Sequence, residues 1–564
     1  MKKYLLVLVG LCCVLSYALA ERPDYPELKK SDANIIGHVL DKKTKEHLPY
    51  ITIALKGTTI GTVTDATGHY FLKNLPEGNF ILEVSSVGYK TVTRNVTLKK
   101  GKTLEEDFEI EEDAIALDGV VVSANRSETT RRMAPTLVNV VDLKLFETTN
   151  SSTLSQGLNF QPGVRVETNC QNCGFQQVRI NGLDGPYTQI LIDSRPVFSA
   201  LSGVYGLEQI PASMIERVEV MRGGGSALFG SSAIAGTINI ITKEPLRNSG
   251  QLSHTITSLG GSSSFDNNTS LNASLVTDDH RAGLYIFGQN RYRSGYDYDG
   301  DGFTELPKLK NQTVGFRSYL KTSTYSKLTF EYHHMQEFRR GGDMLNRPPH
   351  EAHIAEQLQH SIDGGSLKFD YFSPDEKNRL SVFASAANTD RDSYYGPGND
   401  PLKAYGKTTD LTAMGGAQYV HTFDKCFFMP SDLTAGLEYN RDRLKDNMWG
   451  YNRHTDQMVN IYSAFLQNEW KNDRWGILIG GRLDKHNMVD NVIFSPRANL
   501  RFNPTQNINL RLSYSSGFRA PQAFDEDMHI ENVGGTVAMI ERAKDLKEEK
   551  SQSFSASADM YHRF

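Results

Sequence analysis

The feature that most restricts the fold of this chain is a series of segments in which polar and apolar residues alternate. In residues 509–515, NLRLSYS, every second residue is apolar. The same two-residue period holds in residues 433–440, 497–502 and 552–560. Successive side chains of a β-strand point to opposite faces. Each segment is therefore predicted to be a strand with one apolar and one polar face, and the chain to be mainly β.

Two β architectures, a membrane barrel and a soluble sandwich, would show this alternation. After residue 20 no run of 18 apolar residues occurs, so a helical membrane span is excluded. A transmembrane barrel needs apolar residues only at alternate positions, and 25 Tyr and 27 Phe could form its aromatic girdles. Short turns at 277–280 and 503–507 alternate with long predicted loops at 339–365 and 517–549. This pattern favours an antiparallel barrel over residues 247–564, with about 14 strands.

The start of the chain is typical of a secretory signal peptide over residues 1–20, with two lysines, an apolar run and an Ala-Leu-Ala cleavage site. The mature protein then keeps Cys170, Cys173 and Cys426. In an oxidising compartment, the C-x-x-C pair Cys170/Cys173 is predicted to form a local disulfide. Binding of a soft metal ion by the same pair is the alternative.

Residues 32–110 contain many short β-rich runs separated by turns such as Gly57-Thr58 and 76–78, which predicts a β-sandwich. A charged linker follows at 99–113, and then a β-branched run at 120–122. Such a run after a linker is suited to adding itself as a strand to the sheet edge of a partner. Alternatively, it is an edge strand of the sandwich.

Residues 214–243 read as strand, glycine-rich turn, short small-residue segment and strand. Gly223, Gly224 and Gly225 permit backbone angles and close approaches that other residues resist. A parallel βαβ unit that binds phosphate is the other possibility, but the glycine spacing fits neither GxGxxG nor GxxxxGK[ST].

The sequence of this segment resembles the end of the plug domain of TonB-dependent outer-membrane receptors. The resemblance covers 216–220, 222–223, 226–230 and 236–243, and departs at Gly224, where many relatives carry proline. Residues 154–164, 177–183 and 188–197 are also similar to plug motifs. The resemblance implies an α+β plug at 126–245 inside a transmembrane barrel, which has 22 strands in the family. With about 14 strands, this chain is expected to be shortened at its C-terminus; a barrel that closes on fewer strands is the alternative.

The N-terminal sandwich looks like the carboxypeptidase-regulatory-like domain that precedes the plug in Bacteroidetes-type receptors, notably at 64–68 and 87–89. Residues 114–125 resemble the TonB box and its linker. The resemblance implies that a TonB-ExbB-ExbD-type energising complex contacts the following residues: Asp118, Gly119, Val120, Val121, Val122, Ser123 and Ala124.

Several plug residues are predicted to be structural. Charges buried in a polar lumen need partners, and such pairs would hold the plug in register. The residues are Arg179, Arg195, Glu216, Arg222, Gly223 and Gly230.

Two groups could bind ligands. Asp297, Asp299, Asp301 and Glu305 have the alternate spacing of a calcium loop, although the twelfth position is lysine, so a full EF-hand is absent. Cobalamin receptors of the family carry such calcium sites, and a solvated acidic turn is the alternative. No cofactor is otherwise required.

Histidines and one arginine form the second group, because histidine binds transition metals and haem iron. His350 and His353 share a predicted loop, Arg519 belongs to a segment resembling the FRAP box of family receptors, and His529 follows it. The downstream NPNL motif of haem receptors is not recognisable.

The sequence shows no nucleophile elbow and no HExxH, so an enzyme is not expected. A net charge of −5 gives no indication of nucleic-acid binding. The resemblance implies active import of a scarce metal complex (ferric siderophore, haem or cobalamin) across a Gram-negative outer membrane. The barrel would contact the lipid bilayer, with the N-terminal domain and TonB box in the periplasm. A glycan importer working with a surface lipoprotein is the alternative.

Overall fold

The structure is a computed structural model. It describes residues 30–560 apart from 50, 66, 87–88, 112–119, 171, 197–207, 209, 278, 398–403, 506, 524–527, 534–535, 540 and 544. The predicted signal peptide, together with Asp118 and Gly119, lies outside the described residues. None of the helices in the described part is long and apolar enough to cross a membrane.

The N-terminal region is a β-sandwich of two sheets that enclose one apolar core. In one sheet β1 pairs with β4, β7 and β8, and the order of the other is β3–β2–β5–β6. Ile35, Ile53 and Phe108 are fully buried between them. The strands are β1 (Lys30–Asp41), β2 (Thr52–Leu55), β3 (Gly61–Val63), β4 (His69–Pro76), β5 (Gly78–Ser86), β6 (Tyr89–Leu98), β7 (Thr103–Glu105) and β8 (Phe108–Ile110).

The next region is a small α+β domain, the plug, built on a five-stranded sheet of order β11–β16–β17–β14–β15. Val218, Ile238 and Ile240 fill its core. Two hairpin-like pairs, β9–β10 and β12–β13, lie beside this sheet. The elements are β9 (Val120–Val121), β10 (Thr129–Thr130), β11 (Val138–Asp142), α2 (Leu143–Thr148), α3 (Leu154–Leu158), β12 (Val164–Cys170), β13 (Phe175–Ile180), η1 (Gly185–Tyr187), β14 (Thr188–Ile192), β15 (Arg195–Pro196), η2 (Ala212–Met214), β16 (Ile215–Arg222), α5 (Ser226–Phe229) and β17 (Gly236–Thr242).

The glycine-rich turn joins β16 to β17, which pair antiparallel. A parallel βαβ unit is therefore excluded. Gly223 has a φ of 88°, which favours glycine. The four-residue α5 follows the turn directly, so the predicted order of strand, turn, short segment and strand is confirmed.

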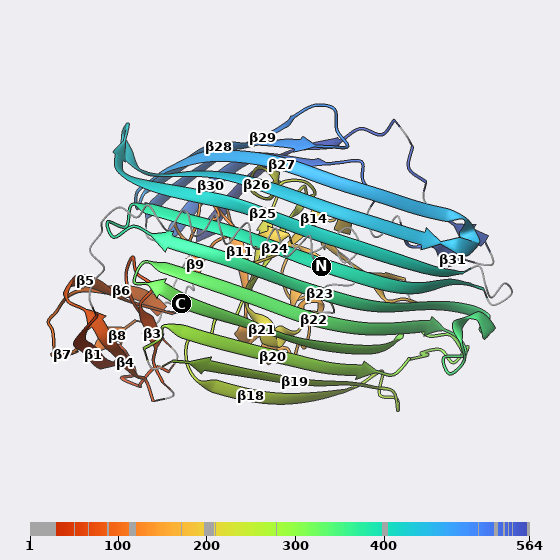
Figure 1. Cartoon of the computed structure of the whole chain (residues 1–564), viewed down its shortest axis with the longest axis horizontal. Helices are drawn as coiled ribbons and strands as arrows, with labels where there is room; N and C mark the ends of the chain where they lie inside the picture. The colour runs from red at the N-terminus through yellow and green to blue at the C-terminus, as the bar shows by residue number, and fades with distance from the viewer. Residues whose placement is uncertain are drawn as a thin grey trace.

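A 14-stranded antiparallel sheet, the wall, curls around the plug (Figure 1). The predicted number of strands is confirmed. Over the described residues, β18 and β33 each pair on one side only. The strands are β18 (Ser249–Ser258), β19 (Phe265–Val276), β20 (Ala282–Arg293), β21 (Lys308–Ser323), β22 (Ser326–Gly342), β23 (Ile354–Phe372), β24 (Asn378–Pro397), β25 (Tyr405–Cys426), β26 (Met429–Met448), β27 (Arg453–Lys471), β28 (Trp475–His486), β29 (Ile493–Thr505), β30 (Ile508–Arg519) and β33 (Glu549–Met560).

The two ends of the wall differ. One end, the short-turn end, carries turns such as 373–377 and 472–474. The other, the long-loop end, carries 294–307, 343–353 with η3 (Pro349–Glu351), η4 (Trp449–Tyr451), and the segment 520–548 with β31 (Glu531–Val533) and β32 (Thr536–Ala538). The loop predicted at 339–365 is shorter than expected, because β22 and β23 continue their pairing to Gly342↔Ala355.

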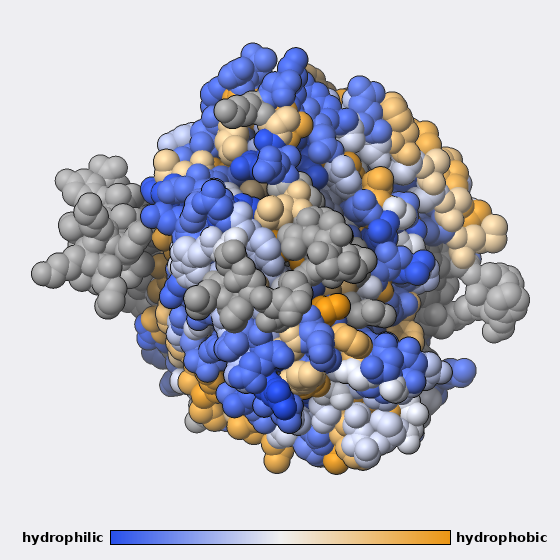
Figure 2. Space-filling view, turned by 90° about the vertical axis from the view of Figure 1, so that its right-hand side faces the viewer, coloured by the Kyte–Doolittle hydropathy of each residue, from blue (hydrophilic) through white to orange (hydrophobic). Residues whose placement is uncertain are grey.

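The wall is polar inside and apolar outside, as its alternation predicted. In β30 the side chains of Asn509 and Arg511 are 2% exposed, whereas Leu510 and Leu512 are 38% and 57% exposed. Figure 2 shows the long-loop end, where hydrophilic residues cover much of the visible face and hydrophobic residues gather along parts of the rim.

The plug lies inside the wall, and the sandwich lies at the short-turn end (Figure 1). Tyr285 and Phe287 of β20 belong to the plug's apolar core cluster. The sandwich contacts a short turn through Thr59, whose backbone N–H donates to the Thr324 carbonyl at 2.9 Å. The wall thus contacts both other domains, the plug on its inside and the sandwich at its short-turn end.

Candidate functional site

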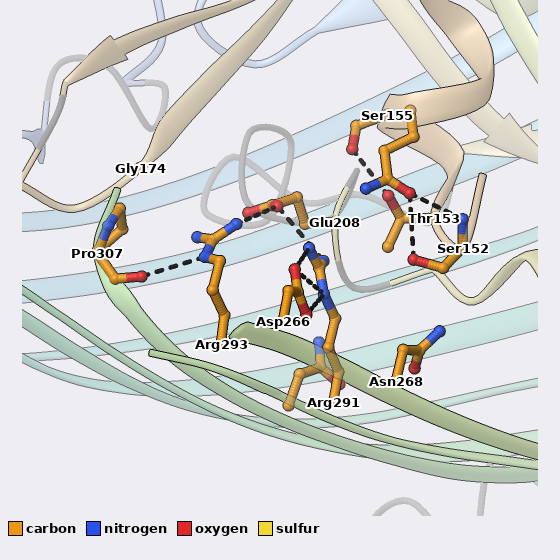
Figure 3. Close-up of polar contacts among 12 residues, drawn as sticks. Ser152, Thr153, Ser155, Gly174, Glu208, Asp266, Asn268, Arg291, Arg293 and Pro307 are labelled. Atoms are coloured by element: carbon orange, nitrogen blue, oxygen red, sulfur yellow. Dashed lines mark hydrogen bonds and ion pairs between the residues drawn. The ribbon is translucent and has the colours of Figure 1, made fainter. Parts of the chain in front are cut away.

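A buried group of charges joins the plug to the wall near the long-loop end (Figure 3). Glu208 of the plug lies 2.7 Å from Arg339, 3.3 Å from Arg293 and 3.4 Å from Arg291. Arg291 also pairs with Asp266, and Arg339 with Glu337, on the wall itself. We call these six residues the Glu208 cluster. Its three guanidiniums balance its three carboxylates, so removal of Glu208 would leave the wall with an excess positive charge.

Burial and the arginines act in opposite directions on the pKa of Glu208. Burial alone would raise this pKa, but Arg339, Arg293 and Arg291 outweigh it and lower the pKa from 4.5 to about 2. Glu208 is therefore ionised at every physiological pH.

We expect a corresponding pH dependence of plug docking. A depressed pKa in the folded state contributes stability that is complete above pH 4.5 and is lost as pH falls toward about 2. The urea midpoint of plug unfolding, measured for the wild type and for Glu208→Gln in detergent, should therefore differ at pH 6. The difference should shrink progressively below pH 4.5. A difference that is independent of pH over this range would contradict the assignment.

A polar cavity of about 250 Å³ borders the Glu208 cluster between the plug and the wall, and Figure 3 shows some of the residues that line it. Ser152, Ser155 and Gln156 line it from the plug, and Asn268 and Arg291 from the wall. Amide, hydroxyl and guanidinium groups are suited to a polar ligand with several hydrogen-bonding atoms. A molecule bound here would touch both domains at once.

The glycine turn and the segment resembling the FRAP box contact each other. A Cβ on Gly224 would lie 2.9 Å from the Ser515 hydroxyl oxygen of β30, so the turn packs closely against the wall. The backbone N–H of Phe518 donates to the Ser226 hydroxyl at 3.3 Å. The guanidinium of Arg519, predicted as a ligand contact, lies over the Tyr187 ring of the plug at 5.3 Å. Arg519 is thus placed at a plug–wall contact.

Of the charged plug residues predicted to be buried, some are buried and others are partly exposed. Arg195 is 7% exposed and lies over the Phe383 ring of the wall. The side chains of Arg179 and Glu216 are 31% and 49% exposed and pair with other plug residues. For these two, the prediction of buried pairs is wrong, because both side chains are partly exposed and their ion pairs lie within the plug. Arg222 is half-buried beside Gly223.

Gly230, the other glycine predicted to be structural, ends α5 with a φ of 82°. A Cβ there would lie 3.2 Å from the guanidinium of Arg482 in β28. Arg482 in turn donates to the Leu228 carbonyl of α5 at 3.2 Å. Glycine at this position therefore permits a close plug–wall contact.

The described part of the predicted partner-binding segment is held by a buried carboxylate, Glu219. Its Oε2 accepts from the backbone N–H groups of Val122 and Ser123, both at 2.9 Å, and from the Ser123 hydroxyl at 2.7 Å. The Ala124 carbonyl accepts from Arg497 of the wall at 2.9 Å. Val121, Ser123 and Ala124 are fully buried. A partner could pair with these residues only after they leave the plug; their contact with TonB stays a prediction.

The cysteine pair is not a disulfide in the structure, which corrects that prediction. Cys170 donates to Glu356 at 3.0 Å, and Cys173 Sγ lies 3.4 Å from His529 Nε2. The two side chains are thus directed to the wall and to the segment after β30 rather than bonded together. A hydrogen bond from Cys173 lowers the pKa of Cys170 to about 7 and outweighs burial.

The acidic loop gathers three of its four predicted ligands. Ligand oxygens of Asp297, Asp299 and Glu305 lie within 4.8 Å of one another on the surface. Asp301 is turned away and accepts from the backbone N–H of Phe303 at 2.8 Å. Calcium binding at this loop stays a prediction.

The histidines predicted as ligands do not come together. His350 bonds to the Tyr405 hydroxyl at 2.8 Å, and His353 pairs with Asp343 at 2.6 Å. His529 is 11% exposed and faces the cysteines. A shared haem or metal site for the three is therefore not formed by the described residues.

Sequence reasoning missed Glu208, Glu219 and Glu356. No motif surrounds Glu208 or Glu356, and the motif around Glu219 gives no sign of its contact with residues 122–123. The partners that matter lie far away in the sequence, up to 186 residues for Cys170 and Glu356. One signal was available for Glu356: it occupies an inward position of a strand, where a carboxylate needs a partner.

Three family models match successive parts of the chain. A CarboxypepD_reg-like domain model matches residues 35–122, a TonB-dependent receptor plug domain model 130–237, and a TonB-dependent receptor-like β-barrel model 236–564. The barrel model alone covers more than half of the 564 residues.

Individual proteins are similar too. The vitamin B12 transporter BtuB of Vibrio vulnificus is 24% identical over 72% of this chain, which spans 64% of the length of that transporter. The fold resembles the siderophore receptor PirA of Acinetobacter baumannii (TM-score 0.65, 19% identity, 77% of this chain and 69% of that one). It also resembles the ferric enterobactin receptor PfeA of Pseudomonas aeruginosa (0.63, 18%, 77% and 70%). With all three domain models matched in order, the chain belongs to the family of TonB-dependent receptors.

Proposed function

We propose that this receptor imports a scarce metal complex across a Gram-negative outer membrane, with energy from a TonB-ExbB-ExbD-type partner. The ligand class is ferric siderophore, haem or cobalamin. The observation that carries the proposal is the plug inside the wall, attached by buried ion pairs such as Glu208–Arg339. Relatives named as a vitamin B12 transporter and as siderophore receptors support the ligand class.

The arrangement suggests how ligand and energy would be coupled. A ligand in the polar cavity would touch Ser152 and Gln156 of the plug and Arg291 of the wall. Because Arg291 also binds Glu208, ligand contacts would compete with the Glu208 cluster and loosen the plug. The partner would then act on residues 120–124. Near them, Asn125 reaches Glu469, two residues before the short-turn end of β27.

The proposed orientation follows from the two ends of the wall. Outer-membrane barrels have short periplasmic turns and longer external loops. The sandwich and the segment at 120–124 would therefore face the periplasm, and the cavity the outside. Outward-facing side chains such as Leu437, Tyr462 and Leu466, each more than half exposed, would contact lipid.

Val121→Pro tests the energy coupling. Proline lacks the N–H that an added strand donates, so the variant should bind the ligand but not import it. Uptake of labelled cobalamin, haem or ferric chelates by a deletion strain carrying the variant is expected to equal that of the deletion strain. Binding to energy-depleted cells should match the wild type. Val121→Ile, which keeps the N–H, is the control. Full uptake by Val121→Pro would refute the proposed coupling.

A further inference from the structure

Four potential metal ligands from three separate parts of the fold meet at the plug surface that faces the long-loop end. Cys170 ends β12, Cys173 lies in the turn to β13, Glu356 is the third residue of β23, and His529 follows β30. One ligand atom of each lies within 4.8 Å of every other. We propose that these four side chains bind a single zinc-type divalent ion, which would attach the plug to the wall and to the segment after β30.

The distances agree with a tetrahedron. Zinc bonds of about 2.3 Å to sulfur and about 2.0–2.2 Å to nitrogen or oxygen put neighbouring ligand atoms about 3.3–3.8 Å apart. Cys173 Sγ lies 3.4 Å from His529 Nε2, and His529 Nε2 lies 3.4 Å from Glu356 Oε2. The distance from Cys170 Sγ to Glu356 Oε2 is shorter, 3.0 Å, because the Cys170 thiol donates a hydrogen bond to Glu356. A bound zinc ion would displace the thiol proton of Cys170, because the metal binds the thiolate form.

The backbone of the turn suits a thiolate ligand. The two cysteines have the C-x₂-C spacing of structural zinc sites. The Cys173 N–H points to Cys170 Sγ at 3.4 Å, which favours a negative sulfur. Gly174 has a φ of 68°, and its N–H donates to the Cys170 carbonyl at 3.0 Å, so the turn closes tightly.

The surroundings shield the group largely from water, and its negative charges would therefore need a cation. Apolar side chains, among them Leu358, Tyr395 and Ile530, pack around Cys173. The Tyr395 ring meets the His529 ring edge-on at 5.3 Å. Two thiolates and a carboxylate in such a place would carry three negative charges, which are costly when buried unless a cation compensates them.

The ligand set indicates the class of ion. Two soft sulfurs, an imidazole and one hard carboxylate are the mixture that Zn²⁺ accepts in tetrahedral sites. Cu⁺ prefers soft ligands throughout, and Ca²⁺ binds oxygen alone. The inference concerns binding by the chain itself and does not depend on import.

The test uses the purified chain in detergent, reduced with a thiol-free reductant, stripped with a chelator and dialysed against Zn²⁺. We expect one retained zinc per chain by elemental analysis. Co²⁺ in place of Zn²⁺ should give sulfur-to-metal charge-transfer absorption and the strong visible bands of a tetrahedral site. Cys173→Ser should lose both signals. Glu356→Gln and His529→Ala should each weaken zinc affinity at least about tenfold.

Cys426→Ser is the matched control, because it removes a thiol at the short-turn end, where Cys426 ends β25. It should retain zinc fully. Heat-modifiable migration on a gel identifies variants with a folded wall, and only those are compared. No zinc in the wild type, equal zinc in Cys173→Ser, or binding of Cu⁺ without Zn²⁺ would each overturn the proposal. So would a Cys170–Cys173 disulfide that forms as readily with Zn²⁺ as without.

Discussion

Glu208→Ala is expected to lower the free energy of plug unfolding by about 3–5 kcal/mol, because breaking a buried ion pair leaves uncompensated charges. The size follows from the geometry: three guanidiniums, those of Arg291, Arg293 and Arg339, share this carboxylate in a place where Glu208 is 5% exposed. Urea-dependent hydrogen exchange of strands β14 to β17 in the detergent-solubilised chain measures the loss directly.

Two variants separate charge from packing. Glu208→Gln keeps the shape of the side chain and should still cost most of the stability, because the excess positive charge remains. Glu216→Ala removes another plug glutamate. Its side chain is 49% exposed and, among the residues that the structure describes, forms an ion pair with Arg217 alone, so a change within about 0.5 kcal/mol is expected. If Glu208→Ala and Glu216→Ala had equal effects, the Glu208 cluster would not hold the plug.

Glu219→Ala should release residues 120–124 from the plug. The substitution leaves two backbone N–H groups and the Ser123 hydroxyl without their acceptor, at about 1–3 kcal/mol for each that stays buried. Residues 120–124 avoid this cost if they leave the plug, because water then accepts their hydrogen bonds. Amide exchange at Val122 and Ser123 should therefore accelerate about a hundredfold, equivalent to about 2.7 kcal/mol. Hydrogen exchange with mass-spectrometric detection measures this.

Ser123→Ala is the graded control for the same contact. It removes the hydroxyl group, and with it the hydrogen bond that Asn239 donates to that hydroxyl at 3.0 Å, but it leaves Glu219 in place. Amide exchange at Val122 and Ser123 is therefore expected to accelerate about tenfold or less. Exchange in β14, which pairs with β15 and β17 and not with residues 122–123, should change little. Unchanged exchange at Val122 in Glu219→Ala would show that other contacts hold this segment.

Local sequence patterns predicted the strands wherever alternation was regular. Residues 509–515 alternate clearly and lie in β30 with the expected faces. The loop predicted at 339–365 includes residues 354–365, yet these belong to β23. Their charged and amide side chains face a polar interior, so the hydrophobic signal of a strand is weak, while the pairing with β22 and β24 is complete.

The candidate site was less predictable, because strand direction alone does not say which polar residues are buried. Glu216 and Glu219 lie in the same strand three residues apart, and they face opposite ways. Only Glu219 is enclosed, at 0% exposure. The sequence singled out Glu216 through a family motif, whereas burial of Glu219 depends on residues 122–123 folding over it.

By itself, the sequence determined the kinds of element and their order, because the side-chain period, glycine turns and apolar faces are local properties of consecutive residues. Which charges and ligands meet was decided only by the tertiary structure. Glu208 meets Arg339, and Cys173 meets His529, across 131 and 356 residues. Such contacts depend on how the plug is seated in the wall, and that position is the sum of many packing and electrostatic contacts that no single segment encodes.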